Sequence, residues 1–600
     1  MQLGKLLRRA AKLGAVTSLA IGAVPGIATA LPSDPFDLPQ TTAEPPLRVP
    51  ATAVCTEKVL SNLFTNSYGA PGFGAHSASA CPGPWAMVVL GIDVSVSGVQ
   101  FDRMFDIYLG RVPMLSSSTS EPASELPGAV THWHIDADVS RFAGMLASGQ
   151  PITAILNNVN NATYTGQYQV DLTLSFYAAG ADAPAAKTPD FIAPLFVAAD
   201  APNADRPGNW GDSGYSPLRA EENVFYEQDL TLPQNLLRLY ADVYAQGHGA
   251  CEEFWWADPG QCGVGTPLRQ VTLSIDGVLA GFAPVYPVLF TGGGGPGSWN
   301  PIPSPRAWHV DPYRLDLTPF AGLLVDGKPH RFKLEVPDAA FSDPGDFWEV
   351  GATLLGDTDH GASLTRGALT SAPVADAATE TISGGTGTID VIQFTATRSG
   401  SWTGYVEGSA GRVETVVSST FDMSALSAIA LTDSSWHWTT ASAVAAGGAA
   451  PVTTTVARTY VLRAPPAGGG HFEDVATTTV DGPAPFQSSF DLNLYTLGAV
   501  YLNLAQLETY TARDSSGYCY DRSVTASAGY VTSDNLGIGC LLPRPPGAGP
   551  SGESAPGDAG TRSAGSAGRF GGALDGALLM VLLVAARWGR SRNAGAARRR

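Results

Sequence analysis

The segment Tyr168-Gln169-Val170-Asp171-Leu172-Thr173-Leu174-Ser175-Phe176-Tyr177 decides the fold class of this chain. Its apolar and polar residues alternate with a period of two, which is typical of an antiparallel strand with one buried face. Ala86–Val96 forms a second β-rich run, and short alternating runs of Thr, Val and Tyr recur along most of the 600 residues. Long helical patterns are missing almost everywhere. The sequence therefore predicts an all-β protein.

A chain of this length exceeds one hydrophobic core and indicates two to four domains. We expect a first β-sandwich at 48–185, a second at 223–360 and a further β-rich C-terminal domain at 369–541. The stretches 31–47 and 186–222 are interpreted as linkers, the second because it is rich in Ala, Pro, Asp and Gly. Within the sandwiches, a strand is expected over Gly98–Leu109, and the dipeptides Asp276-Gly277 and Asp326-Gly327 predict hairpin turns.

Both ends of the chain have the composition of targeting segments. Residues 1–30 combine four basic residues, the apolar run Leu13–Ile27 and the cleavage-type sequence Ala28-Thr29-Ala30, which together predict a signal peptide. Residues 542–569 form a Pro/Gly/Ser-rich tether, and 570–600 combine a short apolar segment with six arginines. This tail resembles bacterial sorting tails, and the alternative is a weak membrane anchor with a short transmembrane helix. We therefore expect an exported protein, in the cell envelope, at the cell surface or secreted.

Six cysteines follow the signal segment, in three pairs that are close in sequence. An even number of cysteines in an exported chain favours disulfide bonds. The nearest partners are Cys55–Cys81, Cys251–Cys262 and Cys519–Cys540, although other connectivities stay open. A zinc site is the alternative, and no C-x-x-C pair supports it.

The charge of the chain excludes one class of partner. Without the basic residues of the signal and tail, 25 basic residues stand against 53 acidic ones, a net charge of about −28. Such a charge argues against nucleic acid as a partner. It also makes any single carboxylate weak evidence for catalysis.

Carboxylates and aromatic rings are densest between Cys251 and Cys262. This stretch holds Glu253, Trp255 and Trp256, and a disulfide across it would fix the loop before a substrate binds. Aromatic faces pack on sugar rings, and carboxylates accept sugar hydroxyls or take protons from water. The alternative is an acidic hairpin loop whose rings cover a core.

Recognisable catalytic motifs are otherwise scarce. The chain has no G-x-S-x-G elbow, H-E-x-x-H, P-loop or dinucleotide fingerprint. His132 and His134 alternate on one strand face and could bind a metal, although a surface or packing role is the commoner one. Asp102-Arg103 brings charge into an apolar strand, where it needs an ion-pair partner or marks a site. Glu121-Pro122 closes a Ser/Thr-rich run, and a turn role is its alternative.

A set of collinear motifs carries a resemblance to a known family. The chain resembles the peptide-N-glycosidase A family of plants, fungi and bacteria over roughly residues 48–540. The matching motifs are Phe101-Asp102-Arg103-Met104-Phe105, Leu109-Gly110, Thr119-Ser120-Glu121-Pro122, Asp138-Val139-Ser140-Arg141-Phe142, Tyr164-Thr165-Gly166, Leu232-Pro233-Gln234-Asn235, Glu253-Phe254-Trp255, Pro267-Leu268-Arg269, Ser274-Ile275-Asp276-Gly277, Pro287-Val288-Leu289-Phe290-Thr291-Gly292-Gly293, Thr318-Pro319-Phe320 and Arg522-Ser523-Val524-Thr525-Ala526. Asp106 departs from the family pattern, which has a small residue there, and so does the Cys251/Cys262 pair.

The resemblance implies two packed eight-stranded jelly rolls with a site at their interface. It also implies hydrolysis of the amide between N-acetylglucosamine and Asn in N-glycopeptides and glycoproteins, which converts Asn to Asp and releases the glycan as a glycosylamine. This chemistry requires no cofactor or metal.

Specific residues can be assigned roles in such a reaction. Amide hydrolysis needs a base for water and a donor for the developing oxyanion. Asp102 or Glu253 is the expected base, and Arg103 or Glu121 is expected to position the sugar or amide. Trp255 and Trp256 would pack on the core sugar rings. The alternatives are a glycosidase with paired carboxylates and a surface lectin or adhesin that binds glycans without cutting them.

Overall fold

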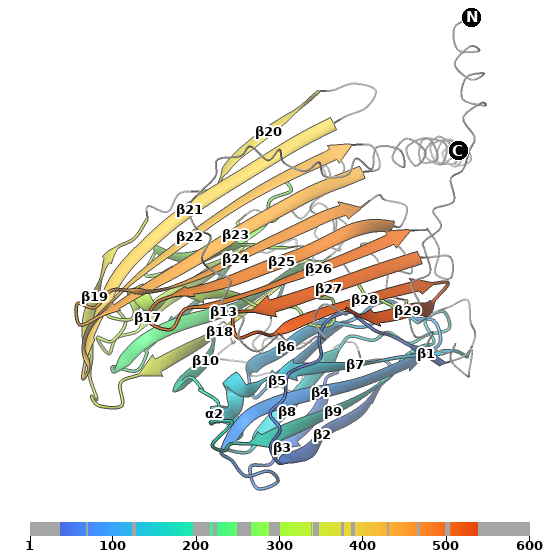
Figure 1. The fold of residues 1–600 in the computed structure, drawn as a ribbon, viewed down its shortest axis with the longest axis horizontal. Helices are drawn as coiled ribbons and strands as arrows, with labels where there is room; N and C mark the ends of the chain where they lie inside the picture. Colours follow the sequence, from blue (N-terminus) through green and yellow to red (C-terminus); the bar gives the residue numbers. More distant parts are fainter. Residues whose placement is uncertain are drawn as a thin grey trace, which may run out of the picture.

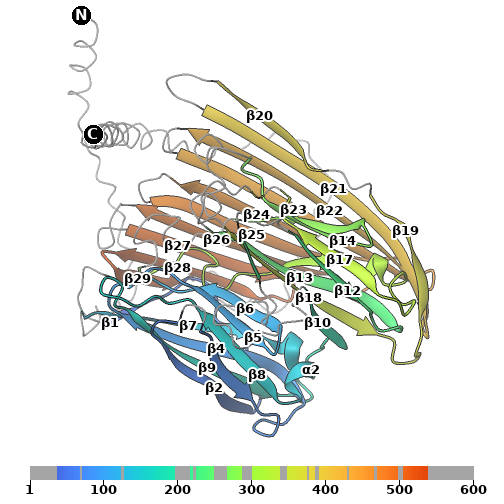
Figure 2. The same ribbon diagram turned by 180° about the vertical axis from the view of Figure 1, so that it is seen from behind.

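The computed structural model is built almost entirely of β-strands, which confirms the all-β prediction. It describes residues 37–67, 70–122, 128–195, 216–219, 225–248, 266–286, 300–337, 339, 347–373, 377–385, 391–428, 431–464, 469–497 and 505–537. Figure 1 shows a small β-sandwich from the first part of the chain lying beside one edge of a long curved sheet from the last part. Figure 2 shows the strands of a second sandwich lying against the face of that long sheet.

Two sheets make up the first sandwich. Sheet A has the order β1-β7-β4-β9-β2, and sheet B has the order β3-β8-β5-β6. The strands of sheet A are β1 (Asp37–Pro39), β2 (Val54–Phe64), β4 (Trp85–Ser97), β7 (Val130–Asp138) and β9 (Gln167–Ala178). Those of sheet B are β3 (Gly72–His76), β5 (Met104–Leu109), β6 (Val112–Ser118) and β8 (Gln150–Leu156), and the short helices η1 (Ser140–Phe142) and α2 (Ala143–Leu146) precede β8.

The core of this sandwich follows from the alternation seen in the sequence. Tyr168, Val170, Leu172, Leu174 and Phe176 of β9 are all buried, and the residues between them face outward. They belong to one apolar cluster with residues of β5, β6 and β8, so sheets A and B pack face to face. The two eight-stranded jelly rolls implied by the resemblance stay a prediction.

The second sandwich combines sheet C, with the order β10-β18-β13-β16, and sheet D, with the order β12-β17-β14-β15. Strand β11 also pairs with β18. The strands are β10 (Phe191–Leu195), β11 (Ser216–Arg219), β12 (Phe225–Leu230), β13 (Leu236–His248), β14 (Gln270–Ile275), β15 (Val278–Pro284), β16 (Tyr313–Asp316), β17 (His330–Glu335) and β18 (Phe347–Thr358), with η3 (Thr318–Phe320) after β16. The hairpin at Asp276-Gly277 is confirmed, and both residues have positive φ, as a type I′ turn requires.

The C-terminal part forms one antiparallel sheet of eleven described strands, sheet E. Its order is β19-β21-β22-β23-β24-β25-β26-β27-β28-β29, and β20 also pairs with β21. The strands are β19 (Arg366–Ser371), β20 (Thr379–Gly385), β21 (Val391–Gly408), β22 (Gly411–Ala428), β23 (Leu431–Ala446), β24 (Val452–Ala464), β25 (Gly469–Asp481), β26 (Phe486–Leu497), β27 (Ala505–Asp514), β28 (Cys519–Ser527) and β29 (Tyr530–Leu536).

Sheet E and the second sandwich share a single core. Phe282 of β15 lies 5.9 Å from Trp402 of β21 and 5.8 Å from Phe421 of β22, measured between ring centroids. The Trp402 indole Nε1 donates to the carbonyl oxygen of Leu279 at 2.7 Å. Gly404 lies so close to Pro319 that an added Cβ would stand 1.9 Å from the Pro319 carbonyl oxygen, so only glycine fits there. Sheet E therefore completes the core of the second sandwich.

Three local expectations differ from the structure. The strand expected over Gly98–Leu109 begins only at Met104, so Phe101, Asp102 and Arg103 precede it and do not alternate across its faces. The stretch interpreted as the linker 186–222 contains β10 and β11, because both pair with β18. Asp326-Gly327 forms a turn, but the strand after it pairs with β12 and β14 and not with the preceding strand.

The disulfide Cys55–Cys81 is confirmed, with a Cα–Cα distance of 5.7 Å. Cys519 is also disulfide-bonded, and its predicted partner Cys540 lies outside the described residues, as does the pair Cys251/Cys262. No helix in the described part of the chain is long and apolar enough to cross a membrane. The predicted signal peptide and the tail 570–600 lie outside this part.

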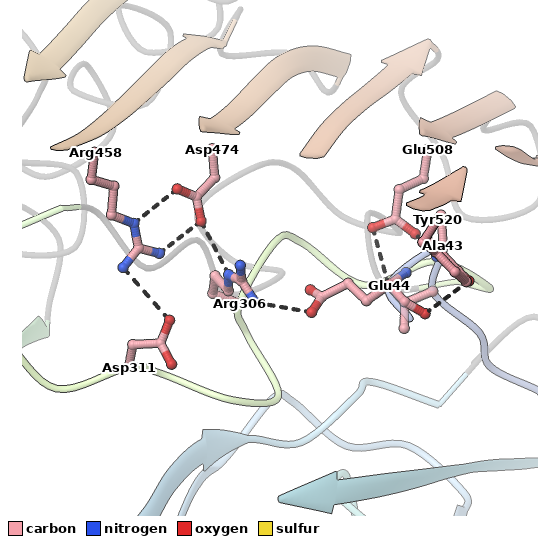
Figure 3. Close-up of polar contacts among 9 residues, drawn as sticks. Ala43, Glu44, Arg306, Asp311, Arg458, Asp474, Glu508 and Tyr520 are labelled. Atoms are coloured by element: carbon pink, nitrogen blue, oxygen red, sulfur yellow. Dashed lines mark hydrogen bonds and ion pairs between the residues drawn. The ribbon is translucent and has the colours of Figure 1, made fainter. Parts of the chain in front are cut away.

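A buried ionic network links sheet E to the rest of the molecule (Figure 3). Asp474 of β25 has no exposed area, and its carboxylate accepts two hydrogen bonds from Arg458 of β24 at 2.7 and 2.8 Å. It accepts a third from Arg306 Nε at 3.1 Å, and Arg306 Nη1 donates to Glu44 at 2.9 Å. Arg306 lies in the loop before β16, and Glu44 lies in the segment after β1. The network therefore fixes two distant segments against sheet E.

Replacing Asp474 by Asn should strongly destabilise the protein. The change removes the shared, fully buried counter-ion of two largely buried guanidinium groups, and breaking a buried ion pair typically costs about 3–5 kcal/mol. We expect a lower urea midpoint by intrinsic fluorescence. The matched control is Asp433→Asn, whose carboxylate pairs with Arg463 at 3.1 Å on the exposed face of sheet E. That variant should lose less than about 1 kcal/mol, and an equal loss in both variants would contradict the role given to the network.

Candidate active site

Two of the family-like motifs meet at the open end of the β5–β6 hairpin. Met104 pairs with Ser118 as the last strand pair, and the backbone contact continues one step further. Thr119 N donates to the Arg103 carbonyl oxygen at 2.8 Å, and Arg103 N donates to Thr119 Oγ1 at 2.8 Å. The segment Phe101–Arg103 therefore lies beside the segment Thr119–Pro122.

Tyr168 of β9 contacts both segments through its hydroxyl group. Its ring has no exposed area, and its hydroxyl oxygen lies 2.8 Å from the carbonyl oxygen of Phe101 and 3.2 Å from that of Ser120. Burial raises the pKa of Tyr168 well above its usual value, and the charges of Asp102 and Glu121 act in the same direction. One buried hydroxyl group thus lies within hydrogen-bond distance of both segments.

A third motif, Tyr164-Thr165-Gly166, joins the same cluster. The Phe101 and Tyr164 rings lie 4.9 Å apart, and Gly166 N donates to the Val99 carbonyl oxygen at 2.9 Å. Gln100 connects the motifs, because its Nε2 donates to the Gly166 carbonyl oxygen at 3.1 Å and its Oε1 accepts from Arg103 Nε at 3.1 Å and also from Arg103 Nη2. These hydrogen bonds fix the conformation of residues 99–103, which do not form a strand.

The predicted carboxylates differ in exposure. Asp102 is half-buried, as is Arg103, whereas Glu121 is only 4% exposed. The backbone oxygen of Glu121 accepts from Asn300 Nδ2 at 3.4 Å, and Asn300 Oδ1 accepts from Gln40 Nε2 at 2.8 Å. Gln40 Oε1 also accepts from the hydroxyl of Ser120. The segment after β1 and the loop after residue 300 therefore complete the surroundings of Glu121.

The segments that carry Asp102, Arg103 and Glu121 lie side by side, and the assignment of these residues to a catalytic site stays a prediction. The other predicted site residues, Glu253, Trp255 and Trp256, lie outside the described residues.

The two predicted histidines are engaged by carboxylates. His132 Nε2 lies 2.7 Å from Asp37, and His134 lies 2.8 Å from Asp93 and 3.0 Å from Asp136. The hydrogen bond to Asp136 raises the pKa of His134 to about 9, with a further contribution from Asp93, although partial burial opposes it. Among the described residues, no group of three or more His, Cys, Asp or Glu side chains could hold a metal ion.

Two buried carboxyl groups lie where the two sandwiches meet. Asp106 of β5 is 4% exposed and Glu349 of β18 is 8% exposed, and Asp106 Oδ1 has no hydrogen-bond partner. Nearby, Gln246 Nε2 of β13 donates to Ser116 Oγ of β6 at 2.6 Å, and Val310 N donates to the Ser116 carbonyl oxygen at 2.9 Å. Burial raises the pKa of Asp106 to about 7, although a hydrogen bond from Ser116 opposes it. Burial and the neighbouring Asp106 also raise the pKa of Glu349 well above its usual value.

Sequence reasoning did not single out Gln40, Asn300 or Glu349. Gln40 and Asn300 carry no local signal, because their contact joins residues 260 positions apart. Asp106 and Glu349 do carry one, since each interrupts an apolar run of a strand, and a buried charge needs a partner or marks a special position.

The protein thus contains two β-sandwiches, and segments with Asp102, Arg103 and Glu121 lie beside the buried Tyr168 of the first one. Residues 35–355 match the family model described as peptide N-acetyl-beta-D-glucosaminyl asparaginase amidase A, and the chain belongs to this family. It is 30% identical over 398 residues to peptide-N4-(N-acetyl-beta-glucosaminyl)asparagine amidase A of almond, Prunus dulcis. The match covers 62% of this chain and 66% of the almond protein.

The similarity of this chain to solved structures is weaker. PNGase F, a glycosylasparaginase from Flavobacterium meningosepticum, matches 51% of this chain and 96% of its own, with 14% identity and a TM-score of 0.33. PNGF-II matches 52% of this chain and 66% of its own, with 14% identity and a TM-score of 0.35. The family assignment rests on the family model and not on these structures.

The carboxyl pair predicts a specific dependence of stability on pH. The folded-state pKa values of Asp106 and Glu349 are raised, so the unfolded chain releases these protons at lower pH than the folded one. The contribution of the pair to stability is therefore most favourable below about pH 4, falls as the pH rises and levels off above the folded pKa values. Asp106→Asn should reduce this fall, measured as the difference in urea midpoint between pH 5 and pH 8.

The matched control for this prediction is Glu380→Gln, which removes an exposed carboxyl group of β20. It should keep the pH dependence of the unmodified protein. An unchanged pH dependence in Asp106→Asn would show that the pair is not held neutral by burial.

Proposed function

We propose that this chain hydrolyses the amide bond between N-acetylglucosamine and Asn in N-glycopeptides and glycoproteins, converting Asn to Asp and releasing the glycan as a glycosylamine. One observation carries the proposal: the motifs at Phe101–Arg103 and Thr119–Pro122 meet at the hydroxyl of Tyr168, and Tyr164–Gly166 packs beside the first of them. Family membership supports the same chemistry, and the almond relative is named as an amidase of this kind.

The roles of the residues follow from the needs of amide hydrolysis. A carboxylate must accept a proton from water as the water attacks the carbonyl carbon, and Asp102 or Glu253 supplies it. A donor must stabilise the oxyanion or hold the sugar, and the guanidinium of Arg103 supplies N–H groups for this purpose. Gln100 fixes the orientation of that guanidinium through its Oε1 atom. Glu121 positions the substrate, and Trp255 and Trp256 pack on sugar rings.

The protein is also proposed to be exported and held at the cell envelope or released from it. The supporting observations are the signal-type residues 1–30, the Arg-rich tail 570–600 and the Cys55–Cys81 disulfide, which suits an oxidising compartment.

Mass spectrometry of a treated glycopeptide tests the proposed reaction. Loss of the glycan with a gain of about one mass unit at Asn is expected, because an amide becomes a carboxylic acid. A residual N-acetylglucosamine on the peptide would mean a glycosidase, and an unchanged glycopeptide that still binds would mean a lectin. Asp102→Asn or Glu253→Gln should lower turnover about 100-fold or more, with whichever residue is the base showing the loss.

Binding and stability measurements separate catalysis from folding in these variants. Glycopeptide affinity and melting temperature should stay close to those of the unmodified protein. The control is Asp171→Asn, which changes a carboxylate paired with Lys58 at 3.0 Å on the outer face of sheet A. It should keep full turnover. Full turnover in both Asp102→Asn and Glu253→Gln would remove these residues from the mechanism.

Deleting residues 570–600 tests the proposed role of the tail. The truncated protein should move from the cell envelope to the medium with unchanged specific activity, because a Pro/Gly/Ser-rich tether transmits little conformational coupling. Fractionation followed by the glycopeptide assay measures both quantities. Retention of the truncated protein at the cell surface would contradict an anchoring or sorting role.

A further inference from the structure

A second candidate site lies at the junction of the first sandwich, the loop before β16 and sheet E. It is a cavity of about 560 Å³. Its walls come from the segment after β1, from β7, from the loop that contains Arg306 and from strands β27 and β28. Figure 3 shows several of its polar groups, including Arg306, Glu44 and Glu508.

The cavity adjoins the cluster described above. Gln40 lines the cavity, accepts a hydrogen bond from Ser120 and donates one to Asn300. Asn300 in turn donates to the backbone of Glu121. Gln40 therefore lies between the cavity and the residues that surround Glu121.

Two buried polar groups in the cavity wall lack partners. Ser304 is 1% exposed and Trp308 is 8% exposed, and both line the cavity. Neither the Ser304 hydroxyl nor the Trp308 Nε1 has a hydrogen-bond partner in the protein. Both atoms are buried beneath the surface of the wall, so a ligand would contact the wall through its other side chains.

The charges in the wall are balanced by one another. Arg306 pairs with Glu44 and Asp474, Arg522 pairs with Asp534 at 2.8 Å, and Arg458 lies 3.6 Å from Asp311. Burial raises the pKa of Glu508 to about 8 and lowers that of His309, so both are neutral near pH 7. The wall thus offers donors and acceptors without a surplus charge that would select an anion or a cation.

Aromatic and proline side chains complete the lining, from Tyr510, Trp308, Pro45, Pro303 and Pro305. Apolar surface combined with balanced, fixed polar groups suits a neutral polyhydroxylated ring, whose faces are apolar and whose edges carry hydroxyl groups. By the same reasoning, a charged peptide segment suits the cavity less well.

We propose that this cavity binds sugar units of the N-glycan beyond the N-acetylglucosamine that is linked to Asn. This inference rests on the proposed function, because it assigns a second part of the same substrate to a second place. It gives sheet E a direct role in recognition, since Glu508, Tyr510 and Arg522 come from that sheet.

The test fills the cavity and compares two substrates. His309 lines the cavity, and His309→Trp would place a large ring in it. One substrate is a glycopeptide with a complete N-glycan, and the other is the same peptide with a single N-acetylglucosamine. We expect His309→Trp to raise KM about tenfold or more for the complete glycopeptide with kcat nearly unchanged, and to leave both constants unchanged for the truncated one.

Three controls make the result interpretable. His360→Trp makes the same change at an exposed histidine paired with Asp190 and should affect neither substrate. His309→Ala keeps the cavity open and removes only one polar group, so it should raise KM for the complete glycopeptide by a smaller factor. Melting temperatures establish that each variant is folded.

Calorimetric titration with free, enzymatically released N-glycan gives a readout that does not depend on catalysis. The unmodified protein should bind this glycan, and His309→Trp should bind it at least about tenfold more weakly. Equal KM values for folded His309→Trp and unmodified protein, or an equal rise for both substrates, would overturn the inference. If no substrate is cleaved, the proposed function fails, and the titration alone then decides whether the cavity binds glycan.

Discussion

The ion pairs of Asp474 determine how the parts of this molecule fit together. A carboxylate with no exposed area is tolerated only when charged partners replace its water, and here Arg458 and Arg306 do so. Arg458 comes from the same sheet, but Arg306 comes from a loop of the second sandwich and brings Glu44 with it. One buried anion therefore requires sheet E, that loop and the segment after β1 to meet, and the candidate glycan cavity lies where they meet.

The candidate active site likewise depends on one buried group, the neutral hydroxyl of Tyr168, that contacts more than one segment. The Tyr168 hydroxyl lies within hydrogen-bond distance of carbonyl oxygens in two segments that precede and follow the β5–β6 hairpin. Because Tyr168 belongs to the well-packed strand β9, the segments with Asp102, Arg103 and Glu121 are fixed by a rigid element of the first sandwich. The packing of sheet A against sheet B thus brings residues that are distant in sequence into one cluster.

Much of the fold could be predicted from the sequence. The features that could not be predicted depend on contacts between residues distant in sequence. Strand β9 and the turn at Asp276-Gly277 were predictable because alternation and turn chemistry are local properties. The conformation of the segment before Met104 was not predictable. A strand was expected there, but side-chain hydrogen bonds of Gln100, Thr119 and Tyr168 fix the segment in another conformation. Motif resemblance grouped Asp102, Arg103 and Glu121 without giving their geometry. Gln40 and Asn300 could not be found, since nothing in a single sequence relates residues so far apart.

We propose that the three motif segments and the adjoining cavity form one glycan-binding surface. Hydrogen–deuterium exchange with and without free, enzymatically released N-glycan tests it most directly, since it needs neither turnover nor substitution. We expect slower amide exchange on glycan binding in residues 99–104, 118–122 and 164–168, and also in 40–47 and 303–311. Protection confined to other regions, such as the outer face of sheet E, would contradict it.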